Sequence, residues 1–211
     1  MHRSKPEIDE ALALLYGDVP LVYGSGPVPC AVMMVGEAPG AREIESGTPF
    51  TGQAGGHLDT FLAELGLPRS AVYISNVCKF RPTRVRHGRR TTISNRTPTT
   101  AEVRTAVPFL LEEIACINPR IIITLGNTPL RAVLGDREIS VGAVHGSSLS
   151  PDTEPLSGRL LFSLYHPASL IYNPSLKPVY ADDVTMIFSL PARGLVSFKR
   201  ISPPSREASA S

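Results

Sequence analysis

Polar side chains that can bind a ligand or stabilise charge stand where four apolar segments of this sequence end. They are Glu37 after residues 32–35, Asn76 within 72–77, Asn127 after 121–126 and His166 within 160–167. In open parallel sheets the carboxyl ends of the strands meet at one edge, and ligands bind there. We therefore expect a carboxylate, two carboxamides and an imidazole on one rim. Donors placed there can stabilise a developing anion, and the carboxylate can stabilise a developing cation.

The apolar runs alternate with segments of helical periodicity, and this alternation indicates the fold class. Helices are predicted at residues 6–15, 56–65, 99–117 and 128–134, the third of them with Thr99 as N-cap and Glu102 completing a capping box. Strands that alternate with helices pair in parallel through right-handed crossovers. We predict an α/β protein, a three-layer α/β/α sandwich around a central four-stranded parallel sheet.

The length of 211 residues and the hydrophobic content of 42% fit one folded domain. We place this domain at residues 1–196 and expect the Ser- and Pro-rich segment 197–211 to be a disordered tail. No apolar stretch approaches the roughly 20 residues of a membrane helix, and the amino-terminal segment has no secretory signal, so we expect a cytoplasmic protein. The three cysteines lie far apart and predict neither a disulfide nor a metal site.

Positive charge is concentrated between Lys79 and Arg96, where seven basic residues occur without an acid. Outside this stretch 14 basic residues face 19 acidic ones, a net charge of −5. Such a block suits a polyanion, because each neutralised phosphate releases counterions. We expect DNA contacts here, although a solvated loop without a partner fits the composition equally well. The arginines expected to contact DNA are Arg84, Arg86, Arg89 and Arg90.

Six motifs in a fixed order resemble the uracil-DNA glycosylase superfamily, and family 4 within it. They are GEAPGxxE, GTPFTGQAGG, NVxKxRP, NRTPT, LGNTPLRAVLG and YHPASL, spread from about residue 22 to about residue 174. The resemblance implies a DNA repair glycosylase that flips uracil out of the helix and hydrolyses its N-glycosidic bond, leaving an abasic site. It also implies a monomer that acts on uracil-containing DNA, single- or double-stranded, close to the nucleoid.

The resemblance implies two catalytic residues and a wedge. Glu37 matches the acid that orients water and stabilises the sugar cation, and His166 matches the donor to uracil O2 that stabilises the departing anion. Leu170 would fill the gap that the flipped nucleotide leaves.

Four further positions are implied to surround the base. Phe50 would stack on uracil, and the Asn76 amide would donate to O4 and accept from N3–H, which distinguishes uracil from cytosine. The backbone at Ala38 would lie against the base, and Glu43 would support the site as a second acid.

The sequence departs from family 4 at the [4Fe–4S] cluster that this family typically carries on four cysteines. The amino-terminal C-x-x-C pair is absent, and two other cysteine positions hold Phe80 and Ala106. We predict that no cluster or other cofactor is bound and that Phe80 packs in the place of the cluster.

Several alternatives remain open. Excision of hypoxanthine or xanthine would need only a shifted pocket, and a DNA-binding protein without activity would need only the basic stretch. A relative that crosslinks to uracil-derived DNA has a histidine where this chain has Asn95 and a glutamine where it has Ala38, so we favour ordinary turnover. Covalent crosslinking to uracil-derived DNA through His87 remains as the other possibility.

Overall fold

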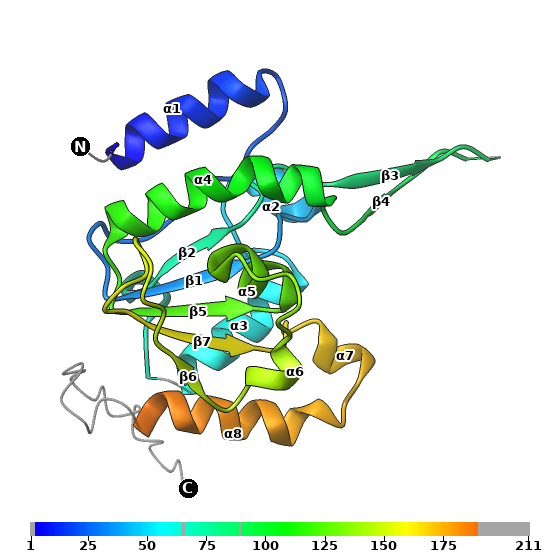
Figure 1. The fold of residues 1–211 in the computed structure, drawn as a ribbon. Helices are drawn as coiled ribbons and strands as arrows, with labels where there is room; N and C mark the ends of the chain where they lie inside the picture. Colours follow the sequence, from blue (N-terminus) through cyan, green and yellow to red (C-terminus); the bar gives the residue numbers. More distant parts are fainter. Residues whose placement is uncertain (1–2, 65, 89, 190–211) are drawn as a thin grey trace, which may run out of the picture.

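A five-stranded sheet forms the centre of the computed structural model, which describes residues 3–64, 66–88 and 90–189 (Figure 1). Its strands are β1 (Val32–Gly36), β2 (Tyr73–Asn76), β5 (Ile121–Leu125), β6 (Ser148–Leu149) and β7 (Leu160–Leu164). The order is β2-β1-β5-β7-β6; the first four strands are parallel and β6 runs antiparallel to β7. The predicted four-stranded parallel sheet is confirmed, and the short strand β6 extends its edge.

Helices cover both faces of this sheet, so the predicted three layers are confirmed (Figure 1). The long helices are α1 (Lys5–Tyr16), α3 (Gln53–Glu64), α4 (Thr100–Ile117), α5 (Asn127–Leu134) and α8 (Leu176–Ser189). Helices α4 and α5 cover one face, with α1 packed on α4, whereas α3 and α8 cover the other face.

Strand alternation divides the core between the two faces. Met33 and Val35 of β1 pack on the side of α4 and α5, whereas Met34 packs on the side of α3 and α8. All residues of β1 and β5 are buried, as expected of parallel strands that are covered on both faces.

The capping box predicted for α4 is present and fixes where this helix begins. The Thr99 hydroxyl accepts from the backbone N–H of Glu102 at 3.2 Å, and the Thr99 N–H donates to Glu102 Oε2 at 2.6 Å. The helix ends before Asn118, which has the left-handed conformation common at helix ends.

The Arg-rich stretch, expected as a loop, forms an antiparallel ribbon of two strands. These strands are β3 (Thr83–Arg86) and β4 (Thr92–Asn95), with Val85 opposite Ile93. The ribbon projects beyond the carboxyl ends of β1, β5 and β7 (Figure 1). Val85, Thr92 and Ile93 have β-branched side chains that favour strands, a signal that the charge of the stretch obscured.

Several elements had no counterpart in the predictions. Besides α8, they are α2 (Ala41–Ser46), the 3₁₀ turn η1 (Arg69–Ala71), α6 (Val141–Val144) and α7 (Ser169–Tyr172). The predicted tail at 197–211 lies outside the described residues. Among the described helices none is long and apolar enough to cross a membrane.

Candidate functional site

Two adjoining cavities open at the carboxyl ends of β1, β2, β5 and β7, where the polar residues were expected to meet. The larger cavity, about 480 Å³, is lined by Glu37, Asn127 and His166, and the smaller, about 320 Å³, by Phe50, Asn76 and His166. Both cavities share His166, Ala38, Pro39 and Asn95. The structure brings these four polar residues together on one rim, and the His166 imidazole lies where the two cavities meet.

Glu37 is held by a residue that lies far away in the chain. Thr128, in the first turn of α5, donates its hydroxyl to Glu37 Oε2 at 2.6 Å, and the Glu37 backbone carbonyl accepts from Cys78 N–H at 3.0 Å. Within the described part of the chain the other carboxylate oxygen, Oε1, has no hydrogen-bond partner. The carboxylate is therefore fixed in orientation and keeps one oxygen for a water molecule or a cation in the larger cavity.

Phe50 has a backbone conformation that is rare for an aromatic residue. Its φ is 56°, in the left-handed region, and its side chain is buried. Arg69 fixes this loop by donating Nη2 to the carbonyls of Pro49 and Phe50, at 2.6 and 2.9 Å. Strained conformations persist where surrounding contacts hold them, and they occur often at functional sites.

Gly36 allows Phe50 and Asn76 to approach each other closely. A Cβ atom at residue 36 would lie 2.5 Å from Phe50 Cζ and closer still to Asn76 Oδ1. Asn76 is only 3% exposed and ends β2 opposite Gly36. The smaller cavity therefore has an aromatic ring and a buried carboxamide side by side, which could stack on a planar base and read its edge.

A buried ionic network lies directly beneath Asn76. Lys79 donates Nζ to the Asn76 carbonyl at 2.8 Å and forms an ion pair with Glu113 Oε2 at 2.6 Å. Glu113 also accepts from the Tyr73 hydroxyl at 2.7 Å and the Ser75 hydroxyl at 2.8 Å. Burial favours the neutral acid, but the Lys79 ammonium and these hydrogen bonds outweigh it and lower the pKa of Glu113. Lys79, counted in the basic block of the sequence, therefore lies in the core and supports the end of β2 beside the smaller cavity.

His166 has the tautomer needed to donate into the cavities. Its Nδ1 accepts from the Ala168 backbone N–H at 3.2 Å, so in the neutral ring the proton is on Nε2. Burial lowers the pKa of His166, which favours this neutral form. The ring centroid lies 6.5 Å from that of Phe50. The loop after β7 thus holds His166 so that its neutral ring keeps Nε2–H as a donor.

Glu43 supports the site through the backbone. Its two carboxylate oxygens accept from the N–H groups of Gly40 and Gly52, each at 3.0 Å, and the side chain is 8% exposed. The resemblance implied a supporting acid near the base. In the structure Glu43 joins the loop after β1 to the loop that carries Phe50, so we interpret it as a positioning residue.

The side chains of the ribbon divide between two faces. Because residues alternate along a strand, Arg84 and Arg86 share one face, whereas Val85 and Ile93 share the other face with Asn95. Val85 and Ile93 are 48% and 59% exposed. Arg89 lies outside the described residues. His87 follows the distal end of β3, about 13 Å along the strand from the cavities, a position that gives no support to trapping through its side chain.

A clamp of Arg96 and Glu102 fastens the base of the ribbon to α4. Arg96 forms two hydrogen bonds of 2.7 Å to the Glu102 carboxylate and donates Nε to the Thr83 carbonyl at 3.1 Å. The hydrogen bonds from Arg96, reinforced by those from Thr99, lower the pKa of Glu102 to about 2. Arg96 therefore has a structural partner, whereas Arg84 and Arg86 have none within the described residues.

This clamp predicts a dependence of stability on pH. A carboxyl group with a lowered pKa stabilises the folded protein above its unfolded pKa, near 4.5, and this contribution is lost as the pH falls toward 2. We expect Glu102→Gln, which keeps a capping side chain, to reduce the slope of unfolding free energy against pH between 4.5 and 2. Urea unfolding at several pH values measures that slope, and equal slopes for both proteins would contradict the assignment.

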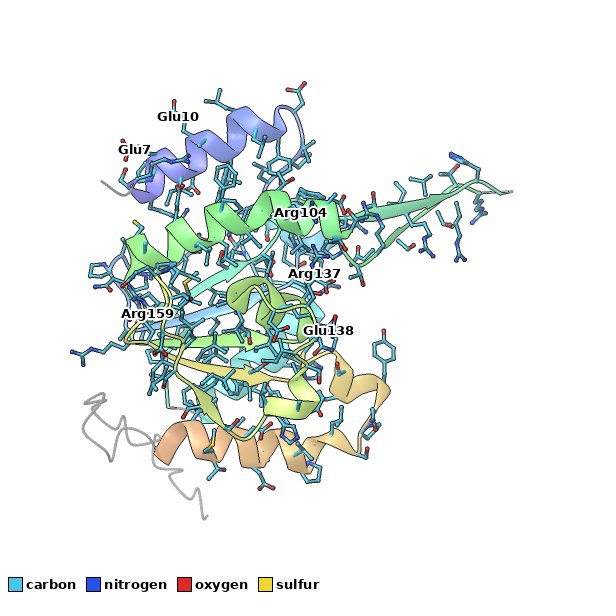
Figure 2. The ribbon with its side chains drawn as sticks, viewed as in Figure 1. Glu7, Glu10, Arg104, Arg137, Glu138 and Arg159 are labelled. Carbon is cyan, nitrogen blue, oxygen red and sulfur yellow. The ribbon has the colours of Figure 1, made fainter. Side chains whose placement is uncertain are left out.

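A third cavity, about 470 Å³, lies between α4 and α5 and shares Thr97 and Thr128 with the larger cavity at the strand ends. Its rim carries Arg104, Arg131 and Arg137 and its floor is apolar. Figure 2 shows Arg104 on α4 and Arg137 beyond α5 on neighbouring parts of the surface. Basic side chains therefore continue along this flank of the rim.

Some residues near the rim were missed or differ from expectation. Leu170, the expected wedge, is partly buried against the core, whereas Tyr172 on the same short helix is 87% exposed. Asn95 was not assigned a role, although it lines both cavities and accepts from Arg81 Nε at 2.7 Å. Its place two residues before Thr97-Pro98, where a crosslinking relative has a histidine, is the signal that could have found it.

The residues present do not fit an iron–sulfur cluster. Phe80 packs against Tyr16 with ring centroids 5.3 Å apart, and Ala106 lies in the same part of the core. The Cys78 thiol is buried, and burial raises its pKa to about 12. Within the described residues no three His, Cys, Asp or Glu side chains are arranged to hold a metal ion.

Comparison with known proteins gives a consistent result. Residues 23–185 match the family model of the uracil DNA glycosylase superfamily. The type-4 uracil-DNA glycosylase of Pyrobaculum aerophilum is 37% identical over 79% of this chain and 81% of its own, and that of Thermotoga maritima is 35% identical over 78% and 79%. A type-5 uracil-DNA glycosylase of P. aerophilum is 29% identical over 72% of this chain and 70% of its own.

Proposed function

The chain belongs to the uracil-DNA glycosylase superfamily, and from this premise we propose that it is a base excision repair enzyme that hydrolyses uracil from DNA and leaves an abasic site. The observation that carries this function is the pair of joined cavities. The smaller cavity is lined by the Phe50 ring and the Asn76 carboxamide, which suit a planar base. The larger cavity is lined by the fixed Glu37 carboxylate, and His166 lines both cavities.

The smaller cavity would hold the flipped base. Uracil would stack on Phe50, while the Asn76 amide donates to O4 and accepts from N3–H. Cytosine presents a donor and an acceptor in the opposite places, so its binding would leave buried polar groups unpaired, at a cost of about 1–3 kcal/mol for each group. This cost is the proposed basis of selectivity.

The larger cavity would hold the sugar and the attacking water. When the bond between C1′ and N1 breaks, its electron pair leaves on the base and positive charge develops on the sugar. His166 Nε2–H would donate to uracil O2 and stabilise the anion, and the Glu37 carboxylate would stabilise the cation. Glu37 Oε1 would orient a water whose oxygen bonds to C1′ and whose proton leaves toward the carboxylate.

The surface around the cavities suits DNA. We propose that Arg84, Arg86 and Arg90 contact phosphates and that Leu170 fills the space of the flipped nucleotide. The packing of Phe80 on Tyr16 supports a fold that needs no cluster, and iron analysis of protein purified without oxygen tests that part of the proposal.

The function is tested with a labelled strand that contains one uracil, paired with G, paired with A or unpaired, followed by alkaline cleavage of abasic sites. We expect scission, and we expect Glu37→Gln to slow it about tenfold, because the amide keeps the Thr128 contact but lacks the charge. Glu45→Gln, an exposed change on α2, is the matched control.

Three outcomes of this test would contradict parts of the proposal. No scission by the wild-type protein would exclude the activity. Faster scission of a hypoxanthine strand would change the substrate. Labelled DNA that stays bound to the protein after denaturation would support covalent crosslinking in place of ordinary turnover.

A further inference from the structure

The ribbon carries two exposed apolar side chains whose position calls for a partner. Val85 and Ile93 form a cross-strand pair, 48% and 59% exposed, on a ribbon that projects from the body of the protein. A two-stranded ribbon alone is at best marginally stable in water. An apolar pair that stays exposed to water adds little to that stability.

The face that carries this pair is the one directed at the cavities. Asn95 belongs to the same face, lines both cavities and has its Nδ2 close to Gly40. Ile93 lies two residues farther along β4 on that face, and Val85 lies opposite Ile93. Arg84 and Arg86 occupy the other face.

The carboxyl ends of the strands define the side from which DNA must approach. The ribbon projects on this side, with α7 at another part of the same edge (Figure 1). The larger cavity is lined by Asn95 and Arg96 at the ribbon base and by Ser169 at the start of α7. A duplex whose nucleotide enters the cavities would therefore pass alongside the ribbon.

From this arrangement, and on the basis of the proposed function, we infer that the ribbon is a duplex-binding arm that enters the major groove beside the flipped nucleotide. A two-stranded ribbon fits the major groove, and Val and Ile side chains can contact thymine methyl groups and sugars there. The long arginines of the other face reach the phosphates at the groove edge. A single strand has no groove, so the apolar pair contributes only on duplex DNA, and the enzyme prefers uracil in duplex DNA.

The test compares Val85→Thr/Ile93→Thr with the wild-type protein on one uracil strand, free or paired. Threonine keeps the β-branched shape that the ribbon needs. We expect kcat/KM on the duplex to fall about tenfold and kcat/KM on the free strand to stay unchanged. Val28→Thr, a change at a residue 49% exposed and near the amino end of β1, is the matched control and should have no effect.

A second variant, Arg84→Gln/Arg86→Gln, separates the apolar contribution from the electrostatic one. We expect it to reduce the slope of log affinity against log salt by about 2 on duplex DNA, because two phosphate contacts are lost, whereas the threonine variant keeps the wild-type slope. An unchanged duplex rate of the threonine variant, or equal losses on both substrates, would overturn the inference. Absence of uracil release by the wild-type protein would instead refute the proposed function.

Discussion

Replacing His166 with alanine is expected to slow uracil release by about 10²–10³-fold, the usual cost of removing one preorganised donor to a developing anion. The loss should appear mainly in kcat, since the anion exists only as the bond breaks. Single-turnover release from a uracil duplex measures it directly. His166→Gln, which places an amide N–H near the position of Nε2, should recover part of the rate.

The matched control for this prediction is His57→Ala, which removes an imidazole from α3. It should leave the rate within twofold of wild type, as a change outside the site. Nitrogen NMR of the wild-type protein tests the tautomer, because Nδ1 should be the unprotonated nitrogen. Equal rates for His166→Ala and wild type would exclude His166 as the donor.

The second large effect is expected in the buried ionic network. Glu113→Ala leaves the Lys79 ammonium without its counter-ion in the core, and breaking such a pair costs about 3–5 kcal/mol. For a chain of this length the corresponding fall in melting temperature is on the order of 10 °C. Thermal unfolding followed by circular dichroism measures this fall.

Two further variants make the interpretation specific. Glu112→Ala, at the preceding residue of α4, removes an ion pair with Arg3 at the surface and should cost less than about 1 kcal/mol. Lys79→Met/Glu113→Leu replaces both charges with apolar groups and should restore most of the lost stability. If the double variant melts no higher than Glu113→Ala, the penalty does not come from an uncompensated charge.

The rim could be predicted from the sequence because its signals are local. Each apolar run fixed the end of a strand, and the α/β alternation placed those ends together, so Glu37, Asn76 and His166 were expected on one edge before any contact was known. The six motifs then assigned their roles. The Thr99 cap was predictable for the same reason, since it depends on four consecutive residues.

The supporting contacts could not be predicted because their partners are distant in sequence. Lys79 stands beside an Arg-rich stretch and reads as a surface cation, yet its partner Glu113 comes 34 residues later. Arg69 binds carbonyls 19 and 20 residues before it. Every residue has such a carbonyl, so no residue type in the sequence indicates these partners. The positive φ of Phe50 is likewise set by these surroundings, because a phenylalanine alone does not favour it.

The hydrogen bond from Thr128 to Glu37 joins residues 91 positions apart. The orientation of the proposed catalytic carboxylate therefore depends on the carboxyl-terminal half of the chain. Neither half alone contains both partners of this hydrogen bond. Because α5 follows β5 in the chain, the pairing of β1 with β5 brings Thr128 to Glu37. A chain in which only one half is folded lacks this hydrogen bond, so we expect it to release uracil more slowly than the complete fold does.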